Sequence, residues 1–290
     1  MRTALGTIVT GCLILSACGG HDKESRPKVE LPGVAVPASL TVASSAVPPA
    51  TPSIDPKTAW MDGVARYQNG DFIGAASSLT VAADGHGDPY RSYLLGLARW
   101  KSGDLAGAEK ALQESVTKNP SSLKGWTNLA RVRNEKNDRK GALDAAEKAL
   151  GLDPTSADAL HQKGRALLEL GRRDEVLDAL KTAHDLDPEN GYIANSFGLL
   201  LIQTGRPQDA VEPLEGAKAR LPHVAYVRNN LGVAYERSGR MDEAKIEYQA
   251  AVEAGDMGGK AMKSLVRLGA SDTTDSNAVL QAAGQPAAEK

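Results

Sequence analysis

The sequence lacks the features from which catalytic and nucleic-acid-binding proteins are recognised. Its 34 basic and 36 acidic residues leave a formal net charge of −2, so the basic excess that drives nucleic-acid binding is absent. Its five histidines stand on different segments, and none is paired at the spacing of metal ligands. We therefore expect no enzyme activity, no metal site, no cofactor and no nucleic-acid partner.

Long apolar runs are also missing, apart from one near the start. Residues 4–15 carry no charge, but this run is too short to cross a bilayer and is typical of a secretory signal. The run ends in Leu15-Ser16-Ala17-Cys18, which resembles the lipobox of bacterial lipoproteins. That resemblance implies a signal peptide over 1–17 and a lipid chain on the Cys18 thiol. The other interpretation is an ordinary signal cleaved near Ala17, which leaves Cys18 as a free thiol.

Cysteine use fits the lipoprotein interpretation. Cys12 would leave with the signal and Cys18 would be lipidated, so the mature chain would hold no thiol for a disulfide, a metal or a nucleophile. Glycines, and no aspartate, follow Cys18. By resemblance to Gram-negative lipoproteins, this implies a lipid anchor in the outer membrane with the rest of the chain facing the periplasm. Residues 18–55 are rich in Pro, Ala and Ser, which predicts an extended tether.

A period of 33 or 34 residues fills most of the remaining chain. Residues at the same position of each period form a column. In one column, each residue is predicted to adopt the left-handed backbone conformation that ends the first helix of a hairpin: Gly70, Gly103, Asn137, Gly171, Gly205 and Gly239. A column of small residues seven positions earlier marks where two helices would cross: Gly63, Gly96, Ala130, Gly164, Gly198 and Gly232. Prolines, which cannot continue a helix, close the second helix in the four middle joints: Pro120, Pro154, Pro188 and Pro222.

This pattern resembles the tetratricopeptide repeat (TPR) over residues 56–256, in six copies. The resemblance implies an all-α fold, a right-handed α-solenoid of about six helical hairpins in which each repeat packs on its neighbours. Residues 257–269 are predicted to add a C-terminal capping helix, and residues 270–290 a disordered tail. Arginines 66, 99 and 133 replace the aromatic residue usual in the family, and we expect them to lie along the stack with packed stems.

In this family the first helix of each hairpin lines a concave groove. Carried over to this sequence, the groove has an apolar and aromatic floor in hairpins one and two, a cationic patch in hairpins three and four, and a polar face in hairpins five and six. The predicted partner-binding residues are Trp60, Tyr67, Tyr93, Leu97, Trp100, Arg131, His161, Arg165, Asn195 and Asn229.

Two of these zones have a second interpretation. Trp60, Val64 and Tyr67 have the spacing of a core face, which they would form if the first hairpin were slightly rotated. Asp62 and Arg66 on the expected seam favour that rotation, although their spacing also lets them pair with each other. The cationic patch, in turn, could be an ordinary solvated helix face.

Lipobox, tether and repeats together resemble the pilotin-type lipoproteins of type IV and tight-adherence (Tad) pilus systems. The resemblance implies a non-enzymatic, outer-membrane-anchored scaffold that binds another envelope protein or a peptide segment, such as part of a secretin, and assists pilus assembly. The alternative is an envelope scaffold for outer-membrane protein assembly or polysaccharide export. The sequence makes no prediction of the oligomeric state.

Overall fold

The computed structural model describes residues 55–83, 87–256 and 258–269. These residues form thirteen α-helices and no strand, which confirms the predicted all-α class. The predicted signal peptide, Cys18, nearly all of the tether and the predicted tail lie outside the described residues. Within the described part, no helix has the length and apolar character needed to cross a membrane.

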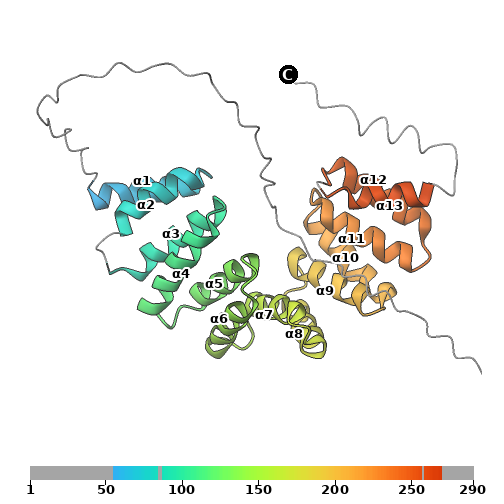
Figure 1. Cartoon of the computed structure of the whole chain (residues 1–290), viewed down its shortest axis with the longest axis horizontal. Coiled ribbons are helices and arrows are strands. Elements are labelled where there is room, and N and C mark those ends of the chain that lie inside the picture. The colour runs from blue at the N-terminus through green and yellow to red at the C-terminus, as the bar shows by residue number, and fades with distance from the viewer. Residues whose placement is uncertain (1–54, 84–86, 257, 270–290) are drawn as a thin grey trace, which may run out of the picture. The chain divides into compact units, whose positions relative to one another are not determined.

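Twelve helices pair into six hairpins that follow one another in chain order, and a thirteenth closes the series (Figure 1). This confirms the predicted solenoid of six hairpins with a terminal helix. The hairpins are α1 (Pro56–Gln68) with α2 (Phe72–Ala83), α3 (Pro89–Lys101) with α4 (Leu105–Lys118), α5 (Leu123–Glu135) with α6 (Arg139–Leu152), α7 (Ala157–Glu169) with α8 (Arg173–Leu186), α9 (Gly191–Gln203) with α10 (Pro207–Arg220), and α11 (Ala225–Arg237) with α12 (Met241–Glu253), followed by α13 (Lys260–Gly269).

The turn inside each hairpin has the conformation that its glycine column predicts. All six turn residues have a positive φ, between 64° and 87°. Asn137, the one residue of the column with a side chain, has the smallest of these angles, at 64°. Asparagine tolerates the left-handed region better than most residues, which explains its place in the third hairpin.

The small-residue column lies where the two helices of a hairpin cross. A Cβ atom built on its glycines would stand 2.5–2.7 Å from a large side chain of the second helix, an overlap that only glycine avoids: Gly63 on Leu79, Gly96 on Leu112, Gly164 on Leu180, Gly198 on Leu214 and Gly232 on Tyr248. Gly63 thus crosses Leu79 just as Gly96 crosses Leu112. The first hairpin therefore keeps the register of the others, while Trp60, Val64 and Tyr67 pack, half-buried, against the cluster between the first two hairpins.

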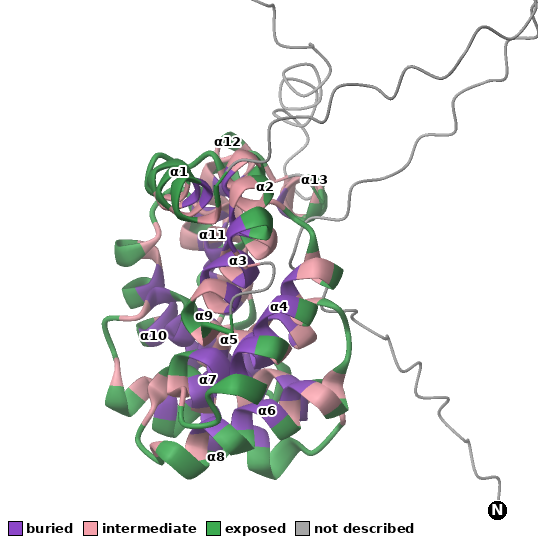
Figure 2. Ribbon diagram, turned by 90° about the vertical axis from the view of Figure 1, so that its left-hand side faces the viewer, coloured by how far each residue is buried: buried purple, intermediate pink, exposed green. Residues whose placement is uncertain are grey.

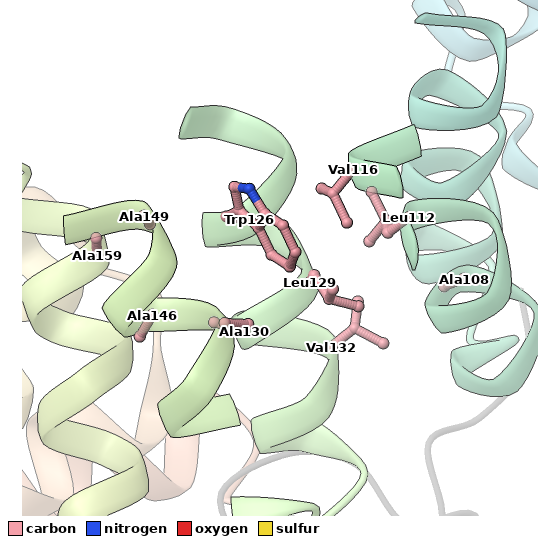
Figure 3. Packing of buried hydrophobic residues seen from close by; sticks show 11 residues of the cluster. Ala108, Leu112, Val116, Trp126, Leu129, Ala130, Val132, Ala146, Ala149 and Ala159 are labelled. Atoms are coloured by element: carbon pink, nitrogen blue, oxygen red, sulfur yellow. The ribbon is translucent and has the colours of Figure 1, made fainter. Parts of the chain in front are cut away.

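Buried side chains form a row of small clusters, each shared between neighbouring hairpins. Figure 3 shows one, in which Trp126, Leu129 and Val132 of α5 face Leu112 and Val116 of α4. On the other side of α5, small residues let α6 and α7 pack closely against it: Ala130, Ala146, Ala149 and Ala159. Burial follows the helix stretches that face other helices, whereas the turns are exposed (Figure 2). The core thus grows lengthwise, as expected of a solenoid.

The terminal helix α13 covers the last hairpin with apolar side chains. Ala261 is fully buried, and Leu265 and Leu268 pack against the cluster of α11 and α12. Arg267 adds a two-pronged contact from α13, with hydrogen bonds of 2.6 and 2.7 Å to the Glu236 carboxylate of α11.

Candidate functional site

The first helices of successive hairpins touch one another directly. From α3 onward, each first helix contacts the next one, whereas second helices make fewer such contacts. We call the surface formed by α1, α3, α5, α7, α9 and α11 the first-helix face. All ten predicted partner-binding residues belong to these helices.

A set of side-chain hydrogen bonds connects successive first helices. Each bond joins residues 35 positions apart, one more than the period, at 2.8–3.1 Å. The pairs are Tyr93 with Asn128, Trp100 with Glu135, His161 with Ser196, and Asn195 with Asn230. Four of the ten predicted residues are therefore held in place by the next hairpin, so their orientation depends on how two repeats pack.

Three aromatic side chains form a row across the first two hairpins. The rings of Trp60 and Tyr90 meet edge to face with centroids 5.9 Å apart, and Tyr90 stacks on Tyr93 at 6.1 Å. Tyr90 is 58% exposed, and the guanidinium of Arg91 lies 5.5 Å from the Trp60 ring. We call Trp60, Tyr90 and Tyr93 the aromatic row. Burial, and after it the neighbouring Tyr67, raises the pKa of Tyr93 above its ordinary value of 10.

Tyr90 was not among the predicted site residues, because its position is not among the groove positions carried over from the family. Pro89 could have pointed to it, since proline favours the first position of a helix and so places Tyr90 on the first turn of α3. Tyr67, which was predicted, lies outside the row. Its ring packs edge-on against Phe72 at 5.4 Å, and with Trp60 and Val64 it half-covers the cluster between the first two hairpins.

Arg131 lies at the centre of a second group on the first-helix face. Its guanidinium donates to Asn128 Oδ1 at 3.1 Å, stands 5.2 Å from the Trp100 ring and pairs with Asp158 at 3.7 Å. Because Asn128 also donates to the Tyr93 hydroxyl, this group continues the aromatic row. We call Trp100, Asn128 and Arg131 the arginine junction. Leu97, also predicted, is half-buried in α3, one turn before Trp100.

His161 lies on the first-helix face, but it adds no positive charge to the predicted cationic patch. The side chain is 7% exposed, and its Nε2 atom is 2.8 Å from Ser196 Oγ. Burial, followed by the charges of Arg165 and Arg131, lowers the pKa of His161 to about 3, so the ring is neutral at neutral pH. The positive charge here belongs to Arg131 and to Arg165, which donates to Gln162 Oε1 at 3.3 Å.

In hairpins five and six, the predicted polar side chains are less exposed than expected. Asn195 is 7% exposed, and its carbonyl oxygen accepts a bond from Asn230, which leaves it little capacity for a partner. Asn229 is half-buried, while Tyr192 and Tyr226 are exposed. The Asn195 amide is thus chiefly a link between α9 and α11.

No cluster of three His, Cys, Asp or Glu side chains in the described residues could hold a metal ion.

Several known proteins share the fold. Similar solved structures include the APC/C heterotetramer Cut9–Hcn1, at 14% identity over 78% of this chain and 44% of that chain, with a TM-score of 0.64. A thermophilic TPR protein of Thermus thermophilus is similar at 20% identity over 62% of this chain and 98% of its own, with a TM-score of 0.53. MamA of Desulfovibrio magneticus RS-1 is similar at 20% identity over 58% and 95%, with a TM-score of 0.51.

Family assignment comes from the sequence comparison. No curated protein sequence matches the chain significantly. The tetratricopeptide repeat model, however, matches residues 93–157, 161–225 and 197–258, together more than half of the 290 residues. The chain therefore belongs to the tetratricopeptide repeat family.

Proposed function

We propose that this protein is an outer-membrane lipoprotein whose first-helix face binds a segment of another envelope protein. TPR proteins typically bind proteins or peptides, and their scaffold is generally non-enzymatic. The observation that carries the proposal is the continuity of the aromatic row with the arginine junction. Trp, Tyr and Arg are the residues that most often dominate the binding energy of protein interfaces.

The arginine junction also indicates the chemistry of the segment. Arg131 is held by Asn128 and the Trp100 ring, so its guanidinium is oriented before a partner arrives. Among the described residues its one ion-pair partner is Asp158, which stands 3.7 Å away and is exposed, so an incoming carboxylate can compete for the guanidinium. Trp100, Leu97 and Tyr93 lie on the neighbouring helix and offer apolar contact. A segment with an acidic residue next to apolar side chains fits this surface best.

The membrane part of the proposal rests on the sequence. Leu15 to Cys18 supports lipidation, the glycines after Cys18 support the outer membrane, and residues 18–55 support a tether that holds the repeats in the periplasm. Multiple acyl chains, unlike a single one, would give stable anchoring. A pilus secretin is the partner that this combination favours, and its assembly is the step that the scaffold would assist.

A capture experiment with matched variants tests the proposal. The mature protein is used as bait on detergent-solubilised envelopes, beside Arg131→Gln and Lys148→Gln. Both substitutions remove one positive charge, but Lys148 lies on the second helix α6, over the Trp126 ring. We expect the wild type and Lys148→Gln to recover a secretin, and Arg131→Gln to bind it about thirtyfold more weakly, which corresponds to a hot spot of about 2 kcal/mol.

Two outcomes would contradict this proposal. Equal recovery by all three baits would remove the binding site from the arginine junction. Recovery of outer-membrane assembly or polysaccharide-export proteins, with no secretin, would favour the alternative function. Membrane fractionation checks the anchor separately, because Cys18→Ser should move the protein from the membrane to the soluble fraction.

A further inference from the structure

Glu135 places a negative charge on the first-helix face, one helical turn from Arg131. Both residues belong to α5, and residues four apart on a helix lie on the same side of it. No ion pair joins these two side chains, both of which the structure describes. Arg131 pairs with Asp158 of α7, whereas the Glu135 carboxylate accepts from the Trp100 indole of α3 at 2.8 Å. Neighbouring helices thus draw the two charges toward opposite sides of α5.

The Glu135 carboxylate forms no ion pair within residues 55–83, 87–256 and 258–269. It is half-buried, and the hydrogen bond that it accepts comes from the neutral Trp100 side chain. Glu109, another half-buried acid, is by contrast paired with both Arg133 and Lys136. A carboxylate that has lost part of its hydration without gaining a counter-charge favours an incoming ammonium or guanidinium group.

The same order of charges recurs one hairpin later. On α7, Arg165 and Glu169 are again four residues apart. The Glu169 carboxylate lies 3.8 Å from Arg139 of the preceding hairpin. The first-helix face of hairpins three and four therefore carries a basic row, Arg131 and Arg165, beside an acidic row, Glu135 and Glu169.

We propose that Glu135 selects a basic side chain of the partner segment, next to the acidic residue that Arg131 binds. This inference rests on the function proposed above, and it narrows the partner to a segment that carries both charges. Four residues of α5 rise about 6 Å, so the acidic and the basic group of the segment lie about that far apart. The order of charges also fixes the direction of the segment on the face, because a reversed segment would bring like charges together.

Selection from a library of random decapeptides tests this specificity. The baits are the mature Cys18→Ser chain, called the parent chain, and its variants Glu135→Lys and Glu212→Lys. Glu212 is an exposed residue of the second helix α10, so its substitution makes the same charge change away from the first-helix face. We expect the parent chain and Glu212→Lys to select peptides in which an acidic and a basic residue recur at one fixed spacing. Glu135→Lys should select a second acidic residue in place of the basic one.

A double-mutant cycle measures the contribution of the pair. Glu135→Gln removes the charge but keeps an oxygen that can accept from the Trp100 N–H, so the packing of α3 on α5 is retained. Replacing the basic residue of a selected peptide with Gln should weaken its binding to the parent chain about fivefold, or about 1 kcal/mol. The same replacement should leave binding to Glu135→Gln unchanged, because the partner charge is already missing.

Two results would overturn the inference: selected peptides without a recurring basic residue, or the same peptides from Glu135→Lys as from the parent chain. Glu135 would then serve only as an acceptor for Trp100. An Arg131→Gln bait in the same selection separates this inference from the partner-binding proposal. If Arg131→Gln selects the same peptides as the parent chain, the proposed binding site is wrong. If it loses the acidic residue while Glu135→Lys changes nothing, only the role of Glu135 is wrong.

Discussion

The first three hairpins and the last three differ at the start of their second helix. In the first half, an arginine of the first helix, an aspartate at the cap and a glycine three residues later recur together: Arg66, Asp71 and Gly74; Arg99, Asp104 and Gly107; Arg133, Asp138 and Gly141. In the second half, the corresponding places hold an apolar or aromatic residue, an arginine and an acid: Leu167, Arg172 and Glu175; Leu201, Arg206 and Asp209; Tyr235, Arg240 and Glu243.

In the first half, the three residues depend on one another. Each aspartate accepts a bond from the backbone N–H of its glycine at 2.9–3.0 Å, which caps the second helix. A Cβ on these glycines would stand 2.0–2.2 Å from the carboxylate. Arg133 fills the remaining space and donates to Glu109 at 2.9 Å, Gln113 at 2.8 Å and the Gly141 carbonyl at 3.2 Å.

The arginines of the first half follow the sequence prediction to different degrees. Arg99 and Arg133 lie along the stack with largely buried side chains, as expected, and each bridges two hairpins. Arg66 follows no hairpin within the described residues, and its side chain is 46% exposed. It pairs with Asp62 at 2.7 Å and with Asp71 at 2.8 Å.

The second half replaces this polar arrangement with apolar packing. Leu167 is fully buried, Leu201 nearly so, and the second helices have no side-chain cap. Each arginine at the cap pairs instead with the acid three residues later, at 2.6–3.0 Å. An arginine at the core position is therefore compatible with the hairpin only when an aspartate and a glycine accompany it.

The largest effect is expected when an arginine is placed in a hairpin that lacks the capping aspartate and the glycine. Leu167→Arg puts a charge into a fully buried site that has Arg172 and Glu175 in place of aspartate and glycine. We expect a loss of more than about 4 kcal/mol, because an unpaired buried charge is among the most destabilising changes. Hydrogen exchange resolved by hairpin should show α7 and α8 opening first.

The reciprocal change, Arg133→Leu, is the matched control. It leaves Glu109 and Gln113 without one hydrogen-bond partner but buries no charge, so we expect a loss of about 1–3 kcal/mol. If Leu167→Arg costs no more than Arg133→Leu, the dependence on aspartate and glycine is wrong.

A second difference between the halves is pH dependence at His161, whose counterpart one repeat earlier is Thr127. The pKa of His161 is lowered from 6.5 to about 3 in the fold, so below pH 6.5 the unfolded chain binds the extra proton. Stability contributed by the neutral ring is complete above pH 6.5 and is lost as the pH falls. The slope is up to about 1.4 kcal/mol per pH unit, or roughly 2 kcal/mol between pH 6.5 and 4.5.

Denaturant unfolding at several pH values measures this slope in the wild type and in His161→Thr. The variant should be flatter over that window. Acids such as Glu109, whose pKa is lowered by hydrogen bonds from Lys136 and Arg133 that outweigh burial, begin to contribute near pH 4.5, but they do so equally in both proteins and cancel in the comparison. Parallel curves for the two proteins would show that His161 takes up a proton in the fold as easily as in the unfolded chain.

A smaller effect separates the two kinds of helix start. Asp138→Ala removes the bond to the Gly141 N–H, and we expect a loss of about 1 kcal/mol. Arg172→Ala at the corresponding place removes an exposed ion pair and should change stability by less than about 0.5 kcal/mol. Urea midpoints compare the two, and equal losses would contradict the distinction between capped and uncapped starts.

The fold could be predicted from the sequence because its constraints act on single residues. A left-handed turn needs glycine or asparagine, and a close helix crossing needs a residue without a large side chain, so Gly70 and Gly63 mark their positions independently of the rest of the chain. Such constraints recur with every repeat, and they determined the number and type of the hairpins.

The candidate site was less predictable because it depends on how successive hairpins pack. The groove positions of the family assigned Tyr93, His161 and Asn195 to the first-helix face. How much of each side chain stays exposed, however, depends on the next hairpin, whose residues 35 positions away hydrogen-bond to them. The charge of His161 depends on that burial, and no single-residue pattern reports it. Tyr90 joins the site through ring contacts on both sides, a relation that only the packed structure shows.

The finest test introduces the cap of the first half into the second half. Arg172 has φ −86° and ψ 65°, close to the −82° and 78° of Asp138, so the backbone suits an aspartate that accepts from the N–H of residue 175. A Cβ at the equivalent Gly141 would stand 2.1 Å from the Asp138 carboxylate, so Arg172→Asp is combined with Glu175→Gly. The double variant loses the exposed pair and gains a cap and a favourable dipole interaction, which the low helix propensity of glycine partly offsets, for a net stabilisation of about 0.5 kcal/mol. A higher urea midpoint and slower hydrogen exchange in the first turn of α8 are expected. Arg172→Asp alone, which keeps the Cβ of Glu175, should be less stable than the double variant, and a double variant less stable than the wild type would show that the cap does not transfer between the halves.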